Sequence, residues 1–315
     1  MRTSSLRRSR GRGWCLIGQC AFTYHVAAAA VARGVPLTNI LVLPTSADDD
    51  PFVSLQTTRM PRWLRQHRLY HGGWRERLVA LCAYRRIALR VTDDLLATTD
   101  IFAAIVVAGL ARKVPDAVLQ RFGSRALNVH PSLLPDLRGP QPEAQAILRG
   151  DRVVGVTIHT MTARFDDGPI RHMAAYALGP LATVGHMEAL AAEHAAEGLR
   201  ALAERPARNW PTIAPAKPSE YHRAYNDSVL ALGTHLTVAD VRRRLRLRPE
   251  GYAFYDAGGA RVYPITVRLR PCRRALPLDL ADGRVFVHAY VTAQEGVVAL
   301  RSCACGAPRA AATSC

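Results

Sequence analysis

Short apolar runs alternate with longer helical segments near the start of the chain, and this alternation limits the possible folds more than any other feature. Residues 14–17 form an apolar run that ends at Gly18, and the Ala-rich residues 22–33 are helical in pattern. A second apolar run follows at 39–43. Strand, helix and strand joined by short connections are typical of a parallel sheet with crossover helices. This region is therefore expected to have an α/β fold.

The same alternation continues for about two hundred residues and then changes. We expect strands at 87–91, 101–110, 126–129 and 153–159, and helices at 78–83, 114–122, 142–149 and 184–204. Four prolines then predict a linker at 205–218. Alternating stretches at 252–256, 261–269 and 284–291, with turns at Gly258-Gly259 and Asp282-Gly283, indicate a small β-rich domain.

These patterns divide the chain into five parts. Residues 14–204 form the expected catalytic domain, and 219–300 form the small C-terminal domain that follows the linker. Residues 1–13 are basic and are expected to be disordered, with a targeting peptide as the alternative. Residues 301–315 form a tail.

Charge and cysteine content restrict the class of protein. The formal net charge is +17, which favours a polyanionic partner, but only two of the 42 basic residues are lysines. Such a bias towards arginine also arises from base composition, so charge alone leaves nucleic-acid binding open. The seven cysteines show no zinc-binding spacing and indicate a reducing, cytoplasmic location, with Cys15 and Cys82 as core residues. No apolar run reaches the ~18 residues of a membrane span, so no membrane partner is expected.

Polar residues with catalytic potential follow the predicted strand at 126–129. Asn128 and His130 are two residues apart, so their side chains leave the same face of a strand. Pro131 keeps His130 extended and ends the strand there. Downstream, Asp166 lies in a turn after the strand at 153–159. Together, Asn, His and Asp can stabilise an oxyanion and move a proton during addition to a carbonyl group, although a His at a strand end is often only a core residue.

Two segments resemble the folate-dependent formyltransferase family. Residues 128–135 read Asn-Val-His-Pro-Ser-Leu-Leu-Pro, and Gly-Val-Thr-Ile-His at 155–159 is followed by Phe-Asp-Asp-Gly-Pro-Ile at 165–170. The resemblance covers about residues 14–200 and implies a Rossmann-like formyltransferase domain with an open parallel sheet. It places the catalytic Asn, His and Asp on Asn128, His130 and Asp166.

The resemblance implies that the protein transfers a formyl group from 10-formyltetrahydrofolate to an amine and needs no metal. Asn128 and a protonated His130 would stabilise the tetrahedral oxyanion, and Asp166 would assist proton transfer. The folate pocket would lie along the segment that follows the strand at 101–110, with Leu110, Ala111, Arg112 and Val114 as binding residues.

The acceptor is expected to be a small amine, such as an amino sugar or an amine derived from an amino acid. The family's methionyl-tRNA enzymes carry a basic loop after the second strand, whereas this chain has the acidic residues 48–50 there. The net charge, the arginines at 242–248 and the β-rich C-terminal domain favour tRNA as the alternative acceptor. The resemblance is also compatible with a 10-formyltetrahydrofolate hydrolase and with a non-catalytic folate-binding protein.

Overall fold

The computed structural model describes residues 13–44, 74–98, 102–213, 221–224, 227–247, 253–257, 260–270, 275–294 and 297–302. Predictions for the basic N-terminus, the acidic residues 48–50, the Gly258-Gly259 turn, linker residues 214–218 and the tail from residue 303 onward lie outside the described residues.

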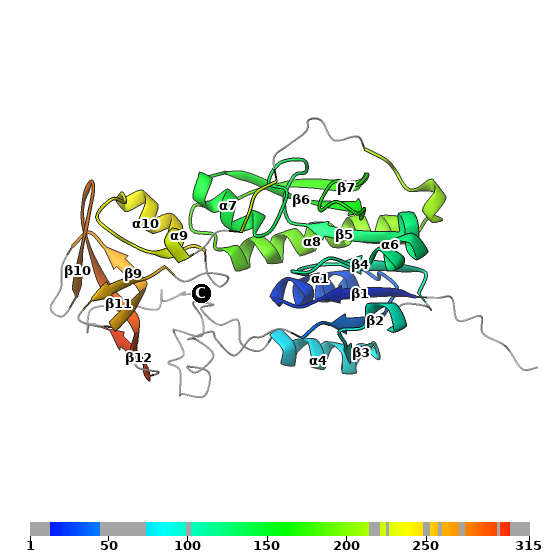
Figure 1. Ribbon diagram of the computed structural model, residues 1–315, viewed down its shortest axis with the longest axis horizontal. Helices are drawn as coiled ribbons and strands as arrows, with labels where there is room; N and C mark the ends of the chain where they lie inside the picture. Colours follow the sequence, from blue (N-terminus) through cyan, green and yellow to red (C-terminus); the bar gives the residue numbers. More distant parts are fainter. Residues whose placement is uncertain are drawn as a thin grey trace, which may run out of the picture.

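Seven strands of the described chain form the main sheet, in the order β3-β2-β1-β4-β5-β6-β7 (Figure 1). Strands β1 to β5 pair in parallel, and β6 is antiparallel to both of its neighbours. This mostly parallel, Rossmann-like sheet confirms the predicted fold class. The strands are β1 (Trp14–Gly18), β2 (Leu37–Val42), β3 (Ala88–Val91), β4 (Ala104–Val107), β5 (Ala126–His130), β6 (Val153–Thr160) and β7 (Ile170–Ala177).

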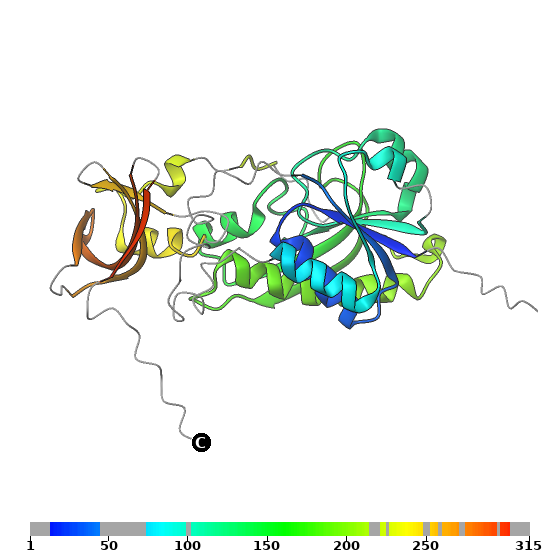
Figure 2. The same ribbon diagram turned by 90° about the horizontal axis from the view of Figure 1, so that it is seen from below.

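Helices cover both faces of this sheet because its strands are apolar on both sides (Figure 2). Successive residues of a strand point to opposite faces. Leu16 of β1 joins the larger core under α1, α4 and α8, whereas its neighbours Cys15 and Ile17 join the core on the α6 side. Cys15 and Cys82 are buried, as predicted. The helices are α1 (Ala21–Ala32), α4 (Trp74–Arg85), α5 (Leu95–Thr98), α6 (Asp116–Phe122), α7 (Pro142–Arg149) and α8 (Val184–Ala203).

The C-terminal region has a separate antiparallel sheet with its own core, which confirms the predicted β-rich part. Val241, Leu278 and Val287 are among the residues buried in this core. The region contains α9 (Asp227–Leu230), α10 (Val238–Arg244), β8 (Tyr255–Ala257), β9 (Ala260–Arg268), β10 (Leu276–Leu280), β11 (Gly283–Gln294) and β12 (Val297–Ser302). Ala281 and Asp282 form the turn between β10 and β11, next to the predicted Asp282-Gly283 position, and Gly283 begins β11.

The arginine run lies partly in a helix that the sequence pattern did not predict. Thr237 caps α10, and its hydroxyl accepts a hydrogen bond from the backbone N–H of Asp240. Short capped helices of this kind have too few apolar positions to show a helical period. Strand β7 was also missed, because its half-buried residues alternate only weakly.

The described part of the predicted linker packs against the main domain. Trp210 is buried, its ring meets that of Trp14 edge to face at 5.9 Å, and its Nε1 donates to Leu202 O over 2.8 Å. The backbone N–H of Ile213 donates to Ile170 O of β7. Trp210 therefore anchors this part of the predicted linker to the main domain, while most of residues 205–213 are exposed. Within the described ranges, every helix is too short or too polar to cross a lipid bilayer.

Candidate active site

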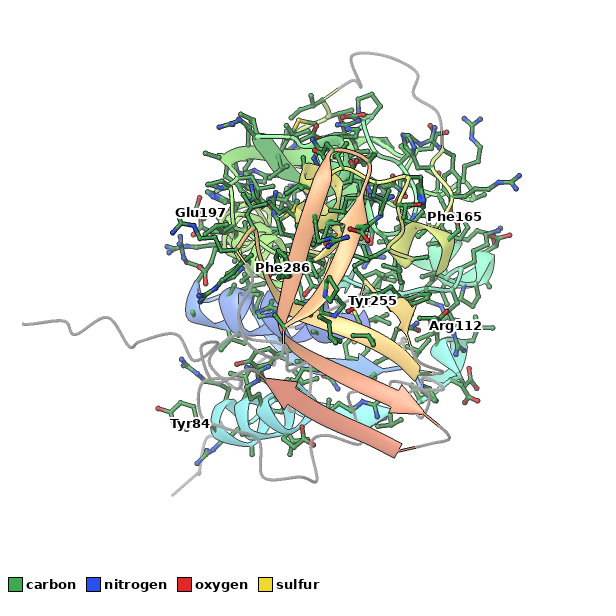
Figure 3. The ribbon with its side chains drawn as sticks, turned by 90° about the vertical axis from the view of Figure 1, so that its left-hand side faces the viewer. Tyr84, Arg112, Phe165, Glu197, Tyr255 and Phe286 are labelled. Carbon is green, nitrogen blue, oxygen red and sulfur yellow. The ribbon has the colours of Figure 1, made fainter. Side chains whose placement is uncertain are left out.

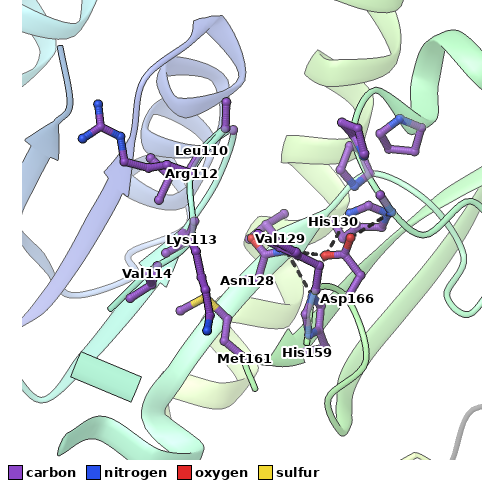
Figure 4. A pocket seen from close by; sticks show the side chains of 18 of the residues that line it. Leu110, Arg112, Lys113, Val114, Asn128, Val129, His130, His159, Met161 and Asp166 are labelled. Carbon is purple, nitrogen blue, oxygen red and sulfur yellow. Dashed lines mark hydrogen bonds and ion pairs between the residues drawn. The ribbon is translucent and has the colours of Figure 1, made fainter. Parts of the chain in front are cut away.

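A cavity of about 690 Å³ opens beside the carboxyl ends of β4 and β5. The order of the main sheet reverses between β1 and β4, which makes this edge the switch point where ligands bind in open α/β sheets. The seven residues predicted for catalysis and folate binding all line this one cavity: Leu110, Ala111, Arg112, Val114, Asn128, His130 and Asp166. The fold thus brings together two sets of residues that are separate in sequence (Figure 4).

Asn128 and His130 leave the same face of β5, as the strand spacing predicted. His130 is 5% exposed, and its Nε2 lies 2.9 Å from Leu137 O. A carbonyl oxygen can only accept, so this Nε2 carries a proton. In the neutral ring, the lone pair is then on Nδ1, which lies 3.6 Å from Asp166 Oδ1.

The loop after β6 places Asp166 opposite these two side chains. Asp166 has a left-handed backbone with φ of 51°, which is uncommon outside glycine. The backbone N–H of Gly139 donates to Asp166 Oδ2 over 2.9 Å. Two residues on, a Cβ at Gly168 would lie 1.7 Å from Thr160 O, so only glycine fits where the loop turns back against β6. These contacts fix the direction of the carboxylate.

A second histidine belongs to the same cluster. Asn128 Nδ2 lies 3.1 Å from His159 Nε2 and donates to Asp166 Oδ1 over 3.3 Å. His159 Nε2 is 3.5 Å from Asp166 Oδ1, and its Nδ1 lies 3.1 Å from Thr160 O. His159 falls within the family-like motif at 155–159 but was not predicted as a site residue. Its place at the end of an alternating strand next to β5 is the signal that could have found it.

Burial and charge determine the protonation states in this cluster. Burial lowers the pKa of His130, and the opposing field of Asp166 does not reverse this, so the imidazole is neutral at pH 7. Burial alone would raise the pKa of Asp166, but His130, His159 and the Gly139 N–H together lower it to about 2. The mechanism expected from sequence used a protonated His130, whereas the free site favours the neutral ring.

The opposite wall of the cavity is the segment predicted to bind folate. Gly109 has φ of 67°, and the chain turns there directly after β4. Leu110 is half-buried, Val114 is buried, and Ala111 and Arg112 are exposed at the cavity wall. In Figure 3, Arg112 and Phe165, which both line the cavity, lie on the side of the molecule away from Glu197 of α8. Among the described residues, no group of three or more His, Cys, Asp or Glu could hold a metal ion.

The fold and the site define a Rossmann-like α/β domain in which an Asn–His–Asp cluster faces a ligand-sized cavity at the switch point. Residues 78–202 match the formyl transferase family. This matched region contains Asn128, His130, His159 and Asp166.

Similar proteins with curated names match the chain over short segments. The mitochondrial methionyl-tRNA formyltransferase of Rattus norvegicus is 43% identical over 86 residues, which is 27% of this chain and 22% of that protein. The methionyl-tRNA formyltransferase of Nitrosococcus oceani is 41% identical over 95 residues, or 30% of this chain and 29% of that protein. The phosphoribosylglycinamide formyltransferase of Bacillus subtilis is 41% identical over 66 residues, which is 21% of this chain and 34% of that protein. The matched segments thus span about a third or less of these relatives.

Solved structures share the fold over most of the chain. HypX from Aquifex aeolicus in complex with tetrahydrofolic acid has a TM-score of 0.60 at 15% identity, covering 92% of this chain and 46% of HypX. The N-formyltransferase from Helicobacter canadensis, in complex with folinic acid and dTDP-3-aminofucose, has a TM-score of 0.55 at 13% identity. That match covers 88% of this chain and 98% of the other. At these identities the likeness concerns the fold alone.

Proposed function

We propose that this protein transfers a formyl group from 10-formyltetrahydrofolate to the primary amine of a small molecule. One observation carries the proposal. In a domain of the formyl transferase family, Asp166 Oδ1 lies within 3.3 to 3.6 Å of Asn128, His159 and His130, on the wall of a cavity of about 690 Å³. Asn128, His130 and Asp166 are the proposed catalytic residues, with His159 as an addition to them.

The reaction needs a neutral amine and a place for one proton. The amine nitrogen bonds to the formyl carbon, and the carbonyl oxygen becomes an oxyanion until the bond from carbon to N10 of the folate breaks. N10 gains a proton, and the amine loses one. Neutral His130 suits this transfer because Nδ1 is its free basic nitrogen. The resulting imidazolium would lie beside ionised Asp166.

Asn128 is the proposed oxyanion donor. In the free site its amide N–H groups face His159 and Asp166. The oxyanion would therefore replace one of these two contacts as charge develops, so the stabilisation would be greatest in the transition state. Leu110, Ala111, Arg112 and Val114 would form the folate wall on the other side of the cavity.

The state of the arginine run supports a small acceptor over tRNA. Arg243 pairs with Asp240, Arg244 Nε donates to Val229 O, and Arg246 Nε donates to Ala182 O. Arg244 and Arg246 therefore connect this run to α9 and to the loop before α8, whereas Arg243 pairs within α10. A phosphate backbone would compete with these contacts. Arg242 is exposed, so it could contribute one charge to the binding of a phosphate backbone.

Methionyl-tRNA is the second candidate acceptor. It is favoured by the names of the rat and Nitrosococcus oceani relatives, which share about two-fifths of their residues with this chain in the matched segments. We propose the cytoplasm as the location because, within the described residues, the buried Cys15 and Cys82 take part in no disulfide. The mitochondrial name of the rat relative favours the mitochondrion instead.

Release of tetrahydrofolate from 10-formyltetrahydrofolate tests the proposal directly. Release that requires an amino sugar or another small amine supports it, and the formylated amine is then identified by mass spectrometry. Release without any amine would indicate a hydrolase, and binding without release would indicate a binding protein.

Salt dependence separates the two acceptors. Formylation of methionyl-tRNA would weaken by ~0.7–0.9 log units per log unit of salt for each phosphate neutralised. A small amine should show a KM that responds only weakly to salt. Efficient, strongly salt-sensitive formylation of methionyl-tRNA would contradict the small-amine proposal.

A further inference from the structure

A short segment between the main domain and the C-terminal region lies against the catalytic loops. This segment, residues 221–224, is here named the strap. The backbone N–H of His222 donates to Arg138 O over 2.8 Å, and Tyr221 pairs with Arg138 in a parallel bridge. A Cβ at Gly139 would lie only 2.2 Å from His222 O. The strap is therefore packed directly on the backbone of residues 138–139.

The two residues under the strap are the ones that hold the Asp166 loop. Gly139 donates its N–H to Asp166 Oδ2 over 2.9 Å. Arg138 donates through Nη2 to Phe165 O over 2.8 Å, and its Nη1 lies 3.3 Å from Asp167 Oδ1. The strap also meets this loop directly, since the rings of Tyr221 and Phe165 are 6.3 Å apart.

The backbone of Asp166 requires support of this kind. A left-handed conformation at a residue other than glycine is unfavourable and persists only where the surroundings determine it. The Gly139 N–H restrains the carboxylate, and Gly139 itself has φ of 108°, held between the loop and the strap. Tyr221 and Ala224 of the strap also line the cavity.

We propose that the strap is a positioning element of the active site: by fixing residues 138–139 through its backbone, it sets the direction of the Asp166 carboxylate. This inference rests on the proposed function of the cluster, because it assigns the strap a part in that chemistry. The site of the main domain is then completed by a segment outside the predicted catalytic domain, residues 14–204. Strap residues do not act on the substrate in this proposal.

The test compares two substitutions at one position in the full chain. His222→Pro removes the N–H that donates to Arg138 O, whereas His222→Ala keeps that N–H and removes only the imidazole. We expect the Gly139 amide to exchange with solvent faster in His222→Pro and to stay protected in His222→Ala. We also expect kcat to fall ~10–100-fold in His222→Pro. KM for 10-formyltetrahydrofolate should stay within about twofold, because the folate wall at 110–114 is on another segment.

A second pair of variants gives the same test if His222→Pro fails to fold. Gly139→Ala forces its Cβ against His222 O, whereas Gly150→Ala puts a Cβ at a residue with a similar positive φ, where the nearest atom is the Arg243 side chain at 3.5 Å. Loss of kcat in Gly139→Ala, with near-native kcat in Gly150→Ala, is the expected result.

The outcomes separate the strap proposal from the proposed function. Unchanged exchange of the Gly139 amide, or unchanged kcat, in a folded His222→Pro protein would overturn the role of the strap. A rise in KM for the donor without a change in kcat would also overturn it. If the wild-type protein transfers no formyl group, the proposed function fails, and the amide exchange still tests whether the strap holds Gly139.

Discussion

Asn128 Nδ2 donates a hydrogen bond to Asp166 Oδ1 over 3.3 Å, across 38 residues of sequence. This contact joins the end of β5 to the loop after β6. The two lie close together because β5 and β6 pair as antiparallel strands. Both side chains lie on the cavity wall, and both histidines of the cluster are within 3.6 Å of the same carboxylate oxygen. The Asp166 carboxylate is therefore the group that connects the whole cluster.

Asp166→Asn should lose most of the formyl transfer while the fold survives. The amide keeps the shape of the carboxylate but not the charge that would stabilise an imidazolium at His130, and such groups contribute ~10²–10⁴-fold to rate. Asp167→Asn is the matched control, because Asp167 pairs with Arg138 and Arg164 and is not among the residues that line the cavity. Its kcat should change by less than about tenfold. Steady-state kinetics of both variants, with circular dichroism to check folding, would test the assignment. Near-native turnover in Asp166→Asn would contradict it.

Acid should destabilise the protein partly through Asp166. Its pKa is about 2 in the fold against an ordinary value of 3.8, so the carboxylate stabilises the native state above pH 3.8. That contribution, about 2 kcal/mol, is lost as the pH falls from 3.8 through 2. His130 adds in the same direction, because its lowered pKa lets the unfolded chain take up a proton first as the pH falls below 6.5. Urea unfolding of wild type and Asp166→Asn at several pH values measures the difference. Equal pH dependence in the two proteins would rule out this role for Asp166.

Gly168→Ala should destabilise the loop that presents Asp166. The added Cβ would meet Thr160 O at 1.7 Å, and backbone cannot move aside as a side chain can. We expect a loss of about 1–3 kcal/mol or more in the free energy of unfolding. Gly179→Ala is the control, since no atom lies within 4 Å of its Cβ position, and its effect should stay within about 0.5 kcal/mol. Denaturant unfolding of both variants would check this, and equal stability would mean that the loop relaxes freely.

The limits of the main domain can be tested through Trp210. We propose that the domain includes residues 205–213, so Trp210→Ala should cost about 3–5 kcal/mol through lost contact with Trp14 and with the C-terminal end of α8. Ile213→Ala, on the same segment but 44% exposed, should cost less than about 1 kcal/mol. Thermal and urea unfolding would measure both. A small effect of Trp210→Ala would favour a domain limit near residue 204.

Many helices and strands of the main domain could be predicted from the local sequence pattern. The helix at 142–149 and the strand at 126–129 agree with α7 and β5 because their apolar periods are clear and Pro131 or Gly150 marks the end. The strand expected at 101–110 is shorter, since β4 covers only Ala104–Val107 and the chain turns at Gly109. Leu110, beyond β4, lines the cavity instead, so its hydrophobicity serves the pocket and not the sheet.

The site was predictable only in part. Asn128 and His130 share a face because side chains alternate along any strand. Their spacing of two residues was therefore enough to place them together. The resemblance supplied Asp166, since nothing in its spacing shows that a turn after β6 folds back towards β5. The neutral state of His130 could not be predicted, because it depends on burial, which lowers the pKa more than Asp166 and the carbonyl of Leu137 raise it.

The sequence by itself determined the alternation of strands and helices, the face shared by Asn128 and His130, and the family of the domain, because these depend on residues close together in the chain. The tertiary structure decided which contacts connect these parts of the site. It added His159 to the cluster through the pairing of β5 with β6, and it placed the strap against Gly139. Local patterns carry no information on such contacts, since they form only when distant segments pack and bring specific backbone groups within hydrogen-bond distance.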